Sequence, residues 1–144
     1  MINPFVNNGT LFYISATLPA TYDSAGYAAV TWTAIRGVRS IGDMGVVWET
    51  FDSNAIGGIR HNKRTGKAAN TVPLEMIKID DAGQTLLKVA SASLNSYSFK
   101  CLAADGTLYY FTAGCSARAN NAGTSASIAD IKITLELDSE LLEV

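Results

Sequence analysis

The chain has 144 residues, of which 48% are hydrophobic and 17% charged, with a formal net charge of −2 at pH 7. This length is typical of one domain with a sizeable core, and the composition excludes wholesale disorder. No apolar run approaches the roughly 20 residues that a membrane helix needs, and the first residues lack the pattern of a signal peptide. We therefore expect a protein that is made and assembled in a cytoplasm.

Early in the chain, the residue pattern predicts β-strands. Residues 30–35 alternate with β-forming side chains on both faces. Residues 38–51 are expected to form one bent strand or two, because Gly42 and Gly45 allow bulges. Residues 72–79 resume a strand pattern, with a proline near the start or on an edge.

Between these strands, residues 52–67 form a basic segment without sustained periodicity, and we predict a long loop there. The segment concentrates four cations, namely Arg60, Lys63, Arg64 and Lys67. The end of the chain is acidic and carries Asp138, Glu140 and Glu143. Such segregation favours head-to-tail association of identical subunits, and the alternative is a solvated basic loop with a solvated acidic strand.

A helix is predicted after the strand at 72–79. Asp81 is expected to cap it, and Gln84 to complete a capping box with the backbone of the cap. The apolar face of this helix is predicted to comprise Leu86, Leu87, Ala90 and Leu94, with Lys88 and Ser91 outward. One helix among strands covers one face or end of a sheet.

A hairpin is predicted in the second half of the chain, with Asp105 and Gly106 as a two-residue type I′ turn. In that register Cys101 pairs with Tyr110. Cys115 then lies an odd number of positions beyond Cys101, on the opposite face and too far away for a disulfide. Two free thiols are typical of a reducing compartment.

The last predicted strand, residues 130–138, alternates strictly. Ile131, Ile133, Leu135 and Leu137 point one way, while acidic, basic and hydroxyl side chains point the other. This pattern predicts a sheet with one dry and one wet face. The wet face would line the channel of a closed tube or meet solvent in an isolated monomer.

Residues suited to catalysis or metal binding are sparse. The single histidine, His61, lies in the basic segment, and neither Cys101 nor Cys115 has a credible local base. Two distant cysteines and one histidine do not make a tetrahedral metal site. We therefore predict no catalytic residue, no metal and no cofactor, and we expect that the protein is not an enzyme.

A role as a dedicated DNA-binding protein is also not expected. The basic segment is the usual electrostatic footprint of phosphate contacts, yet it has no interleaved aromatic side chains. The sequence pI of about 5.3 is low for such a protein.

Five segments in one order carry a resemblance to a known family. They are residues 10–33 (TLFYISATLPATYDSAGYAAVTWT), 37–42, 81–84, 97–100 and 135–138. Together they resemble the tail tube proteins (major tail proteins) of lambda-like siphophages. The resemblance implies a mainly β fold with one flanking α-helix. This α+β β-sandwich or partial barrel would complete a β-barrel channel when six subunits close into a ring.

The resemblance also implies the function. It is that of a structural virion protein, assembled in the host cytoplasm, whose stacked hexameric rings form the hollow tail tube for DNA ejection. The expected partners are other copies of the chain and the tape measure, tail terminator and tail tip proteins. DNA would pass through an acidic lumen without specific binding, and no membrane would take part.

The resemblance assigns parts of the chain as follows. Residues 1–144 form a single tail tube domain without the C-terminal immunoglobulin-like domain of some longer relatives. Residues 1–9 form a flexible arm, including Asn3, Pro4 and Phe5, that orders on assembly. The basic segment matches the long hairpin loop of the family, so its four cations would contact the next ring and meet the acidic residues near the end of the chain.

Other assignments stay open on the sequence. The same fold occurs in tail terminators, in connectors and in secreted tube proteins of contractile injection systems. A monomeric β-sandwich binding module is a further alternative, and it would need an exposed aromatic platform.

Overall fold

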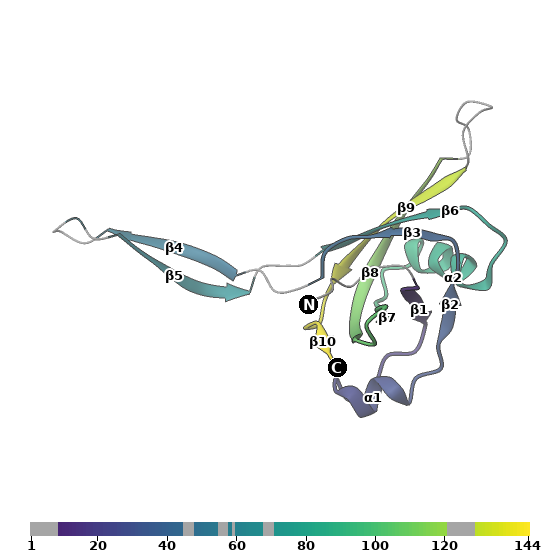
Figure 1. Cartoon of the computed structure of the whole chain (residues 1–144), viewed down its shortest axis with the longest axis horizontal. Helices are drawn as coiled ribbons and strands as arrows, with labels where there is room; N and C mark the ends of the chain where they lie inside the picture. Colours follow the sequence, from purple (N-terminus) through teal and green to yellow (C-terminus); the bar gives the residue numbers. More distant parts are fainter. Residues whose placement is uncertain (1–8, 45–47, 55–57, 59, 68–70, 121–128) are drawn as a thin grey trace, which may run out of the picture.

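The structure is a computed structural model of the chain, and it describes residues 9–44, 48–54, 58, 60–67, 71–120 and 129–144 (Figure 1). In chain order its elements are β1 (Leu11–Ser15), α1 (Ser24–Ala28), β2 (Thr33–Ile35), β3 (Val38–Ile41), β4 (Trp48–Asn54), β5 (Arg60–Lys67), β6 (Thr71–Ile77), α2 (Ala82–Ser91), β7 (Tyr97–Leu102), β8 (Leu108–Asn120), β9 (Asp130–Leu137) and β10 (Leu142–Glu143).

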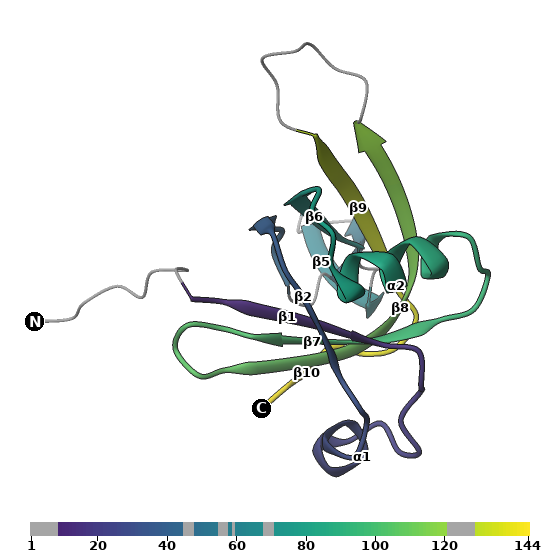
Figure 2. The ribbon, with the colours of Figure 1, turned by 90° about the vertical axis from the view of Figure 1, so that its right-hand side faces the viewer.

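Eight strands form one antiparallel sheet in the order β2-β1-β7-β8-β9-β6-β3, with β10 paired to β8. The two edge strands, β2 and β3, are consecutive in the sequence and joined only by Arg36 and Gly37. The sheet therefore curls toward itself into a partial barrel, and α2 packs against β1, β2 and β8 (Figure 2). This confirms the predicted mainly β partial barrel with a flanking helix.

The core lies inside this partial barrel. Ile131, Ile133 and Leu135 of β9 are buried, as the strict alternation predicts, and Leu137 is half-buried. Their partners Met76, Leu74 and Val72 on β6 and Cys115 on β8 are buried with them. Phe12, Phe99 and Phe111 pack together from β1, β7 and β8, with ring centroids 5.5 to 6.3 Å apart. Full burial of such a side chain contributes about 1.5–3 kcal/mol.

A short helix, α1, was not predicted. Asp23 caps it, because its carboxylate accepts hydrogen bonds from the Gly26 amide at 2.7 Å and from the Thr21 hydroxyl at 2.8 Å. A Cβ atom at Gly26 would lie 1.9 Å from the Thr21 carbonyl oxygen, so only glycine fits at this position. The packed turn places Tyr27, which is 1% exposed, against the sheet.

The predicted capping box at α2 is wrong, although Asp81 does occupy the cap position. The Asp81 carboxylate accepts a hydrogen bond from the Arg36 amide instead of capping the helix. The Gln84 amide donates to the carbonyl oxygens of Arg36 and Ile77 and accepts from the Ile79 amide. Both side chains therefore bind the link between β2 and β3, because this link passes directly over the start of the helix.

The predicted apolar face of α2 is confirmed in part. Leu87 and Ala90 are buried and Leu86 is half-buried, while Lys88 is exposed. Leu94 lies beyond the end of the helix and is fully exposed, so its assignment to that face is wrong.

The β7–β8 hairpin is confirmed, but its register differs by one residue from the prediction. Cys101 pairs with Tyr109, not Tyr110, and the turn contains an extra residue. The amide of Ala103 donates to the carbonyl of Thr107 at 2.9 Å, and Gly106 has a φ of 92°, which favours glycine. Cys101 and Cys115 therefore lie on the same buried face, and both are free thiols.

Residues 38–51 contain two separate strands, β3 and the start of β4. The register shifts between Val38 and Ser40 and between Glu49 and Thr50, not at Gly42, and Gly45 lies outside the described residues. Much of the basic segment belongs to strands as well, so the predicted loop is wrong. The β4–β5 hairpin projects from the barrel as a two-stranded ribbon (Figure 1). Sequence periodicity misses it because β5 has no apolar side chain and β4 has only Trp48 and Phe51, which do not alternate with a period of two.

Candidate assembly surfaces

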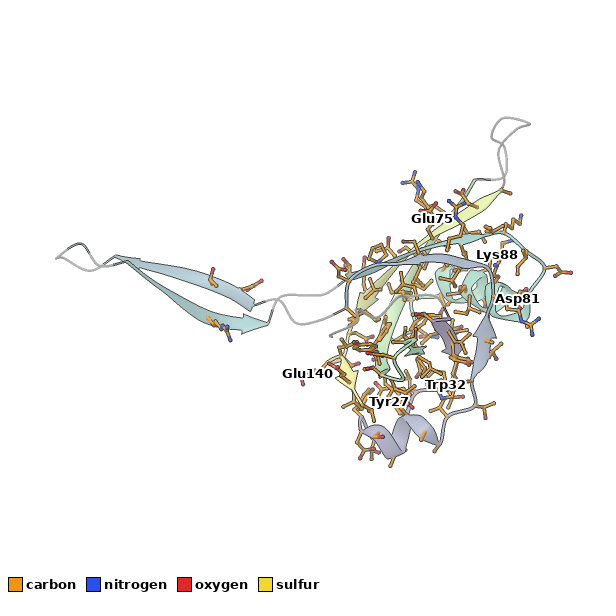
Figure 3. The ribbon with its side chains drawn as sticks, in the orientation of Figure 1. Tyr27, Trp32, Glu75, Asp81, Lys88 and Glu140 are labelled. Atoms are coloured by element: carbon orange, nitrogen blue, oxygen red, sulfur yellow. The ribbon has the colours of Figure 1, made fainter. Side chains whose placement is uncertain are left out.

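One face of the sheet, over β8, β9, β6 and β3, is mostly polar and is not covered by any described helix or strand. We call it the polar face. Its residues lie in rows of register partners, because directly paired residues of an antiparallel sheet share one face. The rows are Gly114, Glu136 and Thr71; Ser116, Thr134 and Pro73; and Arg118, Lys132 and Glu75. The side chain of Glu75 points away from the barrel (Figure 3).

The charges of the polar face are segregated by row. Arg118 and Lys132 are exposed and directly paired, and Lys132 also pairs with Glu75. The Arg39 guanidinium lies 3.5 Å from the Glu75 carboxylate. This row therefore carries three cations and one anion. On β9 its same-face neighbours are Asp130 on one side and Thr134 on the other, and Glu136 lies in the row beyond Thr134.

The corresponding face of the other half of the sheet is covered. Tyr27 from α1 stacks on Tyr110 of β8 with ring centroids 5.1 Å apart. The Lys100 ammonium lies 4.3 Å from the centre of the Tyr13 ring and 5.5 Å from that of Trp32. Burial lowers the pKa of Lys100. Tyr27, Trp32 and α1 lie on the side of the barrel opposite Glu75 (Figure 3).

Both lateral edges of the polar face are open in the described part of the chain. On one side, β8 pairs with β7 only over residues 108–113, so the edge of residues 114–120 has no described partner strand. On the other side, β3 pairs with β6 but with no further described strand. Unpaired edges template the addition of another strand.

The direction of the strands suits the joining of identical copies. The sequence β8, β9, β6, β3 is antiparallel at every step, so its two outer strands run in opposite directions. If β8 of one copy lies beside β3 of the next, the new pair is antiparallel as well. Repetition of that contact by rotation generates a closed ring, in which the open edges of β8 and β3 are both paired.

The predicted inter-ring cations all lie on β5. The backbone register pairs Arg60 with Asn54, Lys63 with Phe51, Arg64 with Thr50 and Lys67 with Trp48. Arg64 is exposed, and His61 lies on the same strand, paired with Ser53. An isolated two-stranded hairpin is at best marginally stable in water, so this one needs a surface to pack on.

The predicted acidic partners lie on the barrel near β10, away from the projecting hairpin (Figures 1 and 3). Glu140 and Glu143 are exposed. Asp138 is engaged within the chain, because its carboxylate accepts hydrogen bonds from the hydroxyls of Ser96 and Thr112. The predicted arm residues Asn3, Pro4 and Phe5 lie outside the described residues.

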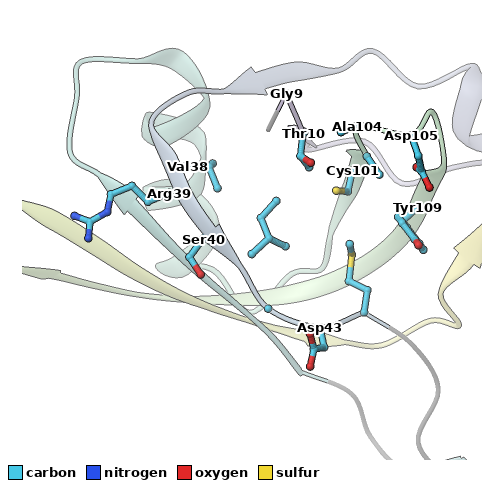
Figure 4. Close-up of a pocket in the computed structure, with 14 residues that line it drawn as sticks. Gly9, Thr10, Val38, Arg39, Ser40, Asp43, Cys101, Ala104, Asp105 and Tyr109 are labelled. Carbon is cyan, nitrogen blue, oxygen red and sulfur yellow. The ribbon is translucent and has the colours of Figure 1, made fainter. Parts of the chain in front are cut away.

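A cleft of about 720 Å³ lies between β3 and the tip of the β7–β8 hairpin, where the partial barrel is not closed (Figure 4). Val38, Cys101 and Tyr109 are among its lining residues, and no histidine is. Burial raises the pKa of the Cys101 thiol to about 11, so the thiol is protonated at neutral pH and a poor nucleophile. The cleft offers no nucleophile with a base beside it.

The described residues contain no group of three or more His, Cys, Asp and Glu side chains arranged to hold a metal ion. Neither described helix is long and apolar enough to cross a bilayer.

Comparison with solved structures finds close structural matches over almost the whole chain. A chain of the PVC sheath/tube terminator, from an extracellular contractile injection system, has a TM-score of 0.69 at 13% identity, covering 99% of this chain and 98% of that one. The chain has the fold of tail tube and tube-terminator proteins. The anti-feeding prophage cap, a tube-terminating cap, matches with a TM-score of 0.64 at 13% identity, covering 100% of this chain and 93% of that one.

The tail tube of SPP1 is also similar, with a TM-score of 0.67 at 13% identity, covering 97% of this chain and 78% of that one. No protein-family model and no curated protein sequence matches the chain. The likeness therefore rests on three-dimensional structure. It supports the sequence resemblance to tail tube proteins at the level of the fold, across phage tails and contractile injection systems alike.

Proposed function

We propose that this protein is the structural subunit of a phage tail tube, and that its copies close into rings that stack into a hollow tube. The observation that carries the proposal is the pair of open, oppositely directed edges on the polar face. In the ring, β8 of each copy pairs with β3 of the next, and the polar face of every copy faces the channel. Because each copy contributes an even number of strands to this wall (β8, β9, β6 and β3), the closed barrel is antiparallel throughout.

Crosslinking tests this edge-to-edge contact. A double variant, Ser40→Cys with Ser116→Cys, places one thiol on each edge strand. Burial holds the pKa of both native thiols at about 11, so a short bismaleimide reacts with the introduced thiols first. The double variant should give a ladder of oligomers that ends at the ring size, while each single variant should give at most dimers. A double variant that stays monomeric on a denaturing gel under tube-forming conditions rules out the contact.

Stacking of the rings is assigned to the β4–β5 hairpin. Its cations Arg60, Lys63, Arg64 and Lys67 would meet acidic groups on the adjacent ring, such as Glu140 and Glu143, with Asp138 nearby. The length and isolation of the hairpin support this role, because a ribbon of this kind gains stability only by packing on another surface. Docking of opposite charges also fixes the orientation of each ring.

Charge reversal tests the stacking role. A triple variant, Arg60→Glu, Lys63→Glu and Arg64→Glu, should remain folded and form rings but fail to stack. Its matched control is His61→Ala on the same strand, which should assemble like the wild type. Electron microscopy and sedimentation over a concentration series provide the readout. Normal tubes from the triple variant would contradict this role for the hairpin.

The remaining assignments follow the sequence resemblance. Residues 1–9, with Asn3, Pro4 and Phe5, act as an arm that orders during assembly, so their deletion should slow tube growth without unfolding the subunit. The rings are hexameric, and the tube belongs to the tail of a virion of the lambda-like siphophage type. It is assembled in the host cytoplasm together with tape measure, tail terminator and tail tip proteins, and DNA passes through its lumen.

A second candidate, a tube terminator, is favoured by one observation. The chain and the PVC terminator cover each other almost completely, at 99% and 98% of their lengths. A terminator ends a tube, so the purified protein would form single rings that do not stack. Tubes that lengthen with protein concentration support the tube subunit, and single rings at every concentration support the terminator.

A further inference from the structure

We propose that the row Arg118, Lys132, Glu75 and Arg39 forms a cationic belt around the channel, which contacts the phosphates of duplex DNA in transit. This inference rests on the proposed tube and on the polar face as its wall. On this proposal the acidic lumen has one cationic level, because the row holds three cations and a single anion.

The geometry of the belt follows from strand register. Arg118 and Lys132 occupy directly paired positions on β8 and β9, and both side chains are exposed. Glu75 continues the row on β6, and the Arg39 guanidinium lies 3.5 Å from its carboxylate. Of the cations in the row, Arg118 is therefore the farthest along the row from the carboxylate. Each copy adds one such row to the wall.

A contribution to the stability of the fold does not explain why three cations lie together in this row. Like charges at directly opposed positions of an antiparallel pair destabilise the pair, so Arg118 beside Lys132 is unfavourable for folding alone. The exposed ion pair between Arg39 and Glu75 contributes at most about 1 kcal/mol. Replacing Arg118 by a neutral polar residue would relieve the repulsion at no cost to the core, since the buried partners in this part of β9 are Ile131 and Ile133.

The chemistry of the row fits phosphate. Lysine and arginine side chains make the contacts by which proteins bind the DNA backbone irrespective of sequence. Hydroxyls of Ser116 and Thr134 occupy the next row and are exposed. Asp130 lies next to the row on β9 and Glu136 lies beyond the hydroxyl row, so the attraction to phosphate is limited to these levels of each ring. A belt of this kind holds the duplex away from the acidic levels of the wall and lets it slide, because phosphate contacts carry no sequence preference.

Nuclease protection of a short labelled duplex tests the belt in assembled tubes. DNA in the channel is shielded from a nuclease that is too large to enter, whereas DNA on the outer surface is digested. Wild-type tubes should protect the duplex at low salt and release it as salt rises. The double variant Arg118→Gln with Lys132→Gln should lose most of this protection, and the salt dependence should weaken by a logarithmic slope of about 0.9 for each phosphate contact removed.

The matched control is Lys88→Gln, which removes one exposed cation from α2 and should protect DNA like the wild type. The single variant Lys132→Gln should show an intermediate loss and serves if the double variant assembles poorly. Protection by the double variant equal to that of wild type overturns the belt. Protection of an acidic polypeptide from protease, without protection of DNA, overturns the assignment to nucleic acid.

A labelling experiment separates failure of the belt from failure of the tube wall. Thr134→Cys places a thiol in the middle of the polar face, and Ser24→Cys places one on α1, on the opposite side of the barrel. In tubes, a bulky maleimide should label Ser24→Cys but not Thr134→Cys, while both react in the monomer. Rapid labelling of Thr134→Cys in tubes refutes the wall and the belt together. A shielded thiol with unchanged DNA protection in the double variant refutes the belt alone, and absence of tubes refutes the proposed function.

Discussion

The substitution Gln84→Leu tests whether one buried amide holds the two ends of the sheet together. Gln84 is 4% exposed and makes three hydrogen bonds, to Arg36 at 2.8 Å, Ile77 at 2.9 Å and Ile79 at 3.1 Å. These partners belong to the link between β2 and β3, to the end of β6 and to the loop before α2. The side chain thus joins the segments at which the partial barrel comes closest to closing.

The magnitude follows from the lost partners. Each neutral hydrogen bond contributes about 1 kcal/mol, and each buried group left without a partner costs about 1–3 kcal/mol. Burial of the leucine side chain offsets part of this loss. We expect a net destabilisation of about 3 kcal/mol. For a domain of this length, with an unfolding entropy of about 2.1 cal/mol/K per residue, that corresponds to a melting temperature lower by about 10 °C.

Urea unfolding followed by circular dichroism measures this change, with Thr85→Ala as the control. Thr85 is the next residue on the same helix, is exposed, and donates a hydroxyl hydrogen bond to the Asp81 carbonyl at 3.0 Å. Its loss should cost less than about 1 kcal/mol. If Gln84→Leu destabilises the protein no more than Thr85→Ala does, the amide does not hold the link and our reasoning about this contact is wrong.

Three further predictions concern the turn before α1 and the thiols. Gly26→Ala should destabilise the protein by about 2 kcal/mol or more, measured by thermal unfolding, because its Cβ atom would lie 1.9 Å from the Thr21 carbonyl oxygen; an unchanged melting temperature would contradict this. Hydrogen bonding by the Gly26 amide lowers the pKa of Asp23 below 3.8, so its stabilising effect is complete above that pH and lost as pH falls through the lowered value. Asp23→Asn should therefore flatten the acid limb of a stability-against-pH curve, and an unaltered limb argues against the cap. Burial raises the pKa of Cys101 and Cys115 from 9.0 to about 11, so at neutral pH Ellman's reagent should react with both only after denaturation; prompt reaction of the native protein would show that the core opens.

Sequence predicted the features that depend on local periodicity. The alternation of Ile131, Ile133 and Leu135 identifies a strand and its dry face, because a side-chain period of two is unambiguous when one face is buried. The hairpin turn at Gly106 is equally local, yet its register is wrong by one residue. The dipeptide Asp105-Gly106 suits both a two-residue turn and a longer one, and only the packing of Phe99 against Phe111 distinguishes them.

Sequence did not predict the features that depend on distant partners. Gln84 has the spacing of a capping box, but it donates to the Arg36 carbonyl, which lies 48 positions away in the sequence. The short helix α1 has five residues, too few for a periodic pattern, and depends on the Asp23 cap and on Tyr27 packing. The open edges of the polar face follow from sheet order, which no single segment encodes.

If the proposed ring forms, the edge strands of each copy also carry features that oppose premature pairing. Proteins protect open edges with short strands, bulges and charged side chains. The β3 strand has four residues, a bulge between Val38 and Ser40 and the charged Arg39, while the open part of β8 carries Arg118. Cations on both edges disfavour pairing between two copies that meet at random. A copy that joins a growing ring with matched edges gains a full antiparallel ladder of hydrogen bonds, which offsets this repulsion.

Added salt should act in opposite directions on the two assembly steps. It should screen the repulsion between the exposed edge cations and speed ring formation, and it should weaken stacking through the oppositely charged hairpin. Light scattering over a salt series, on the wild type and on the hairpin charge-reversal variant, separates the two steps: the variant should retain only the salt-accelerated phase, and its absence would show that the edge cations do not govern closure.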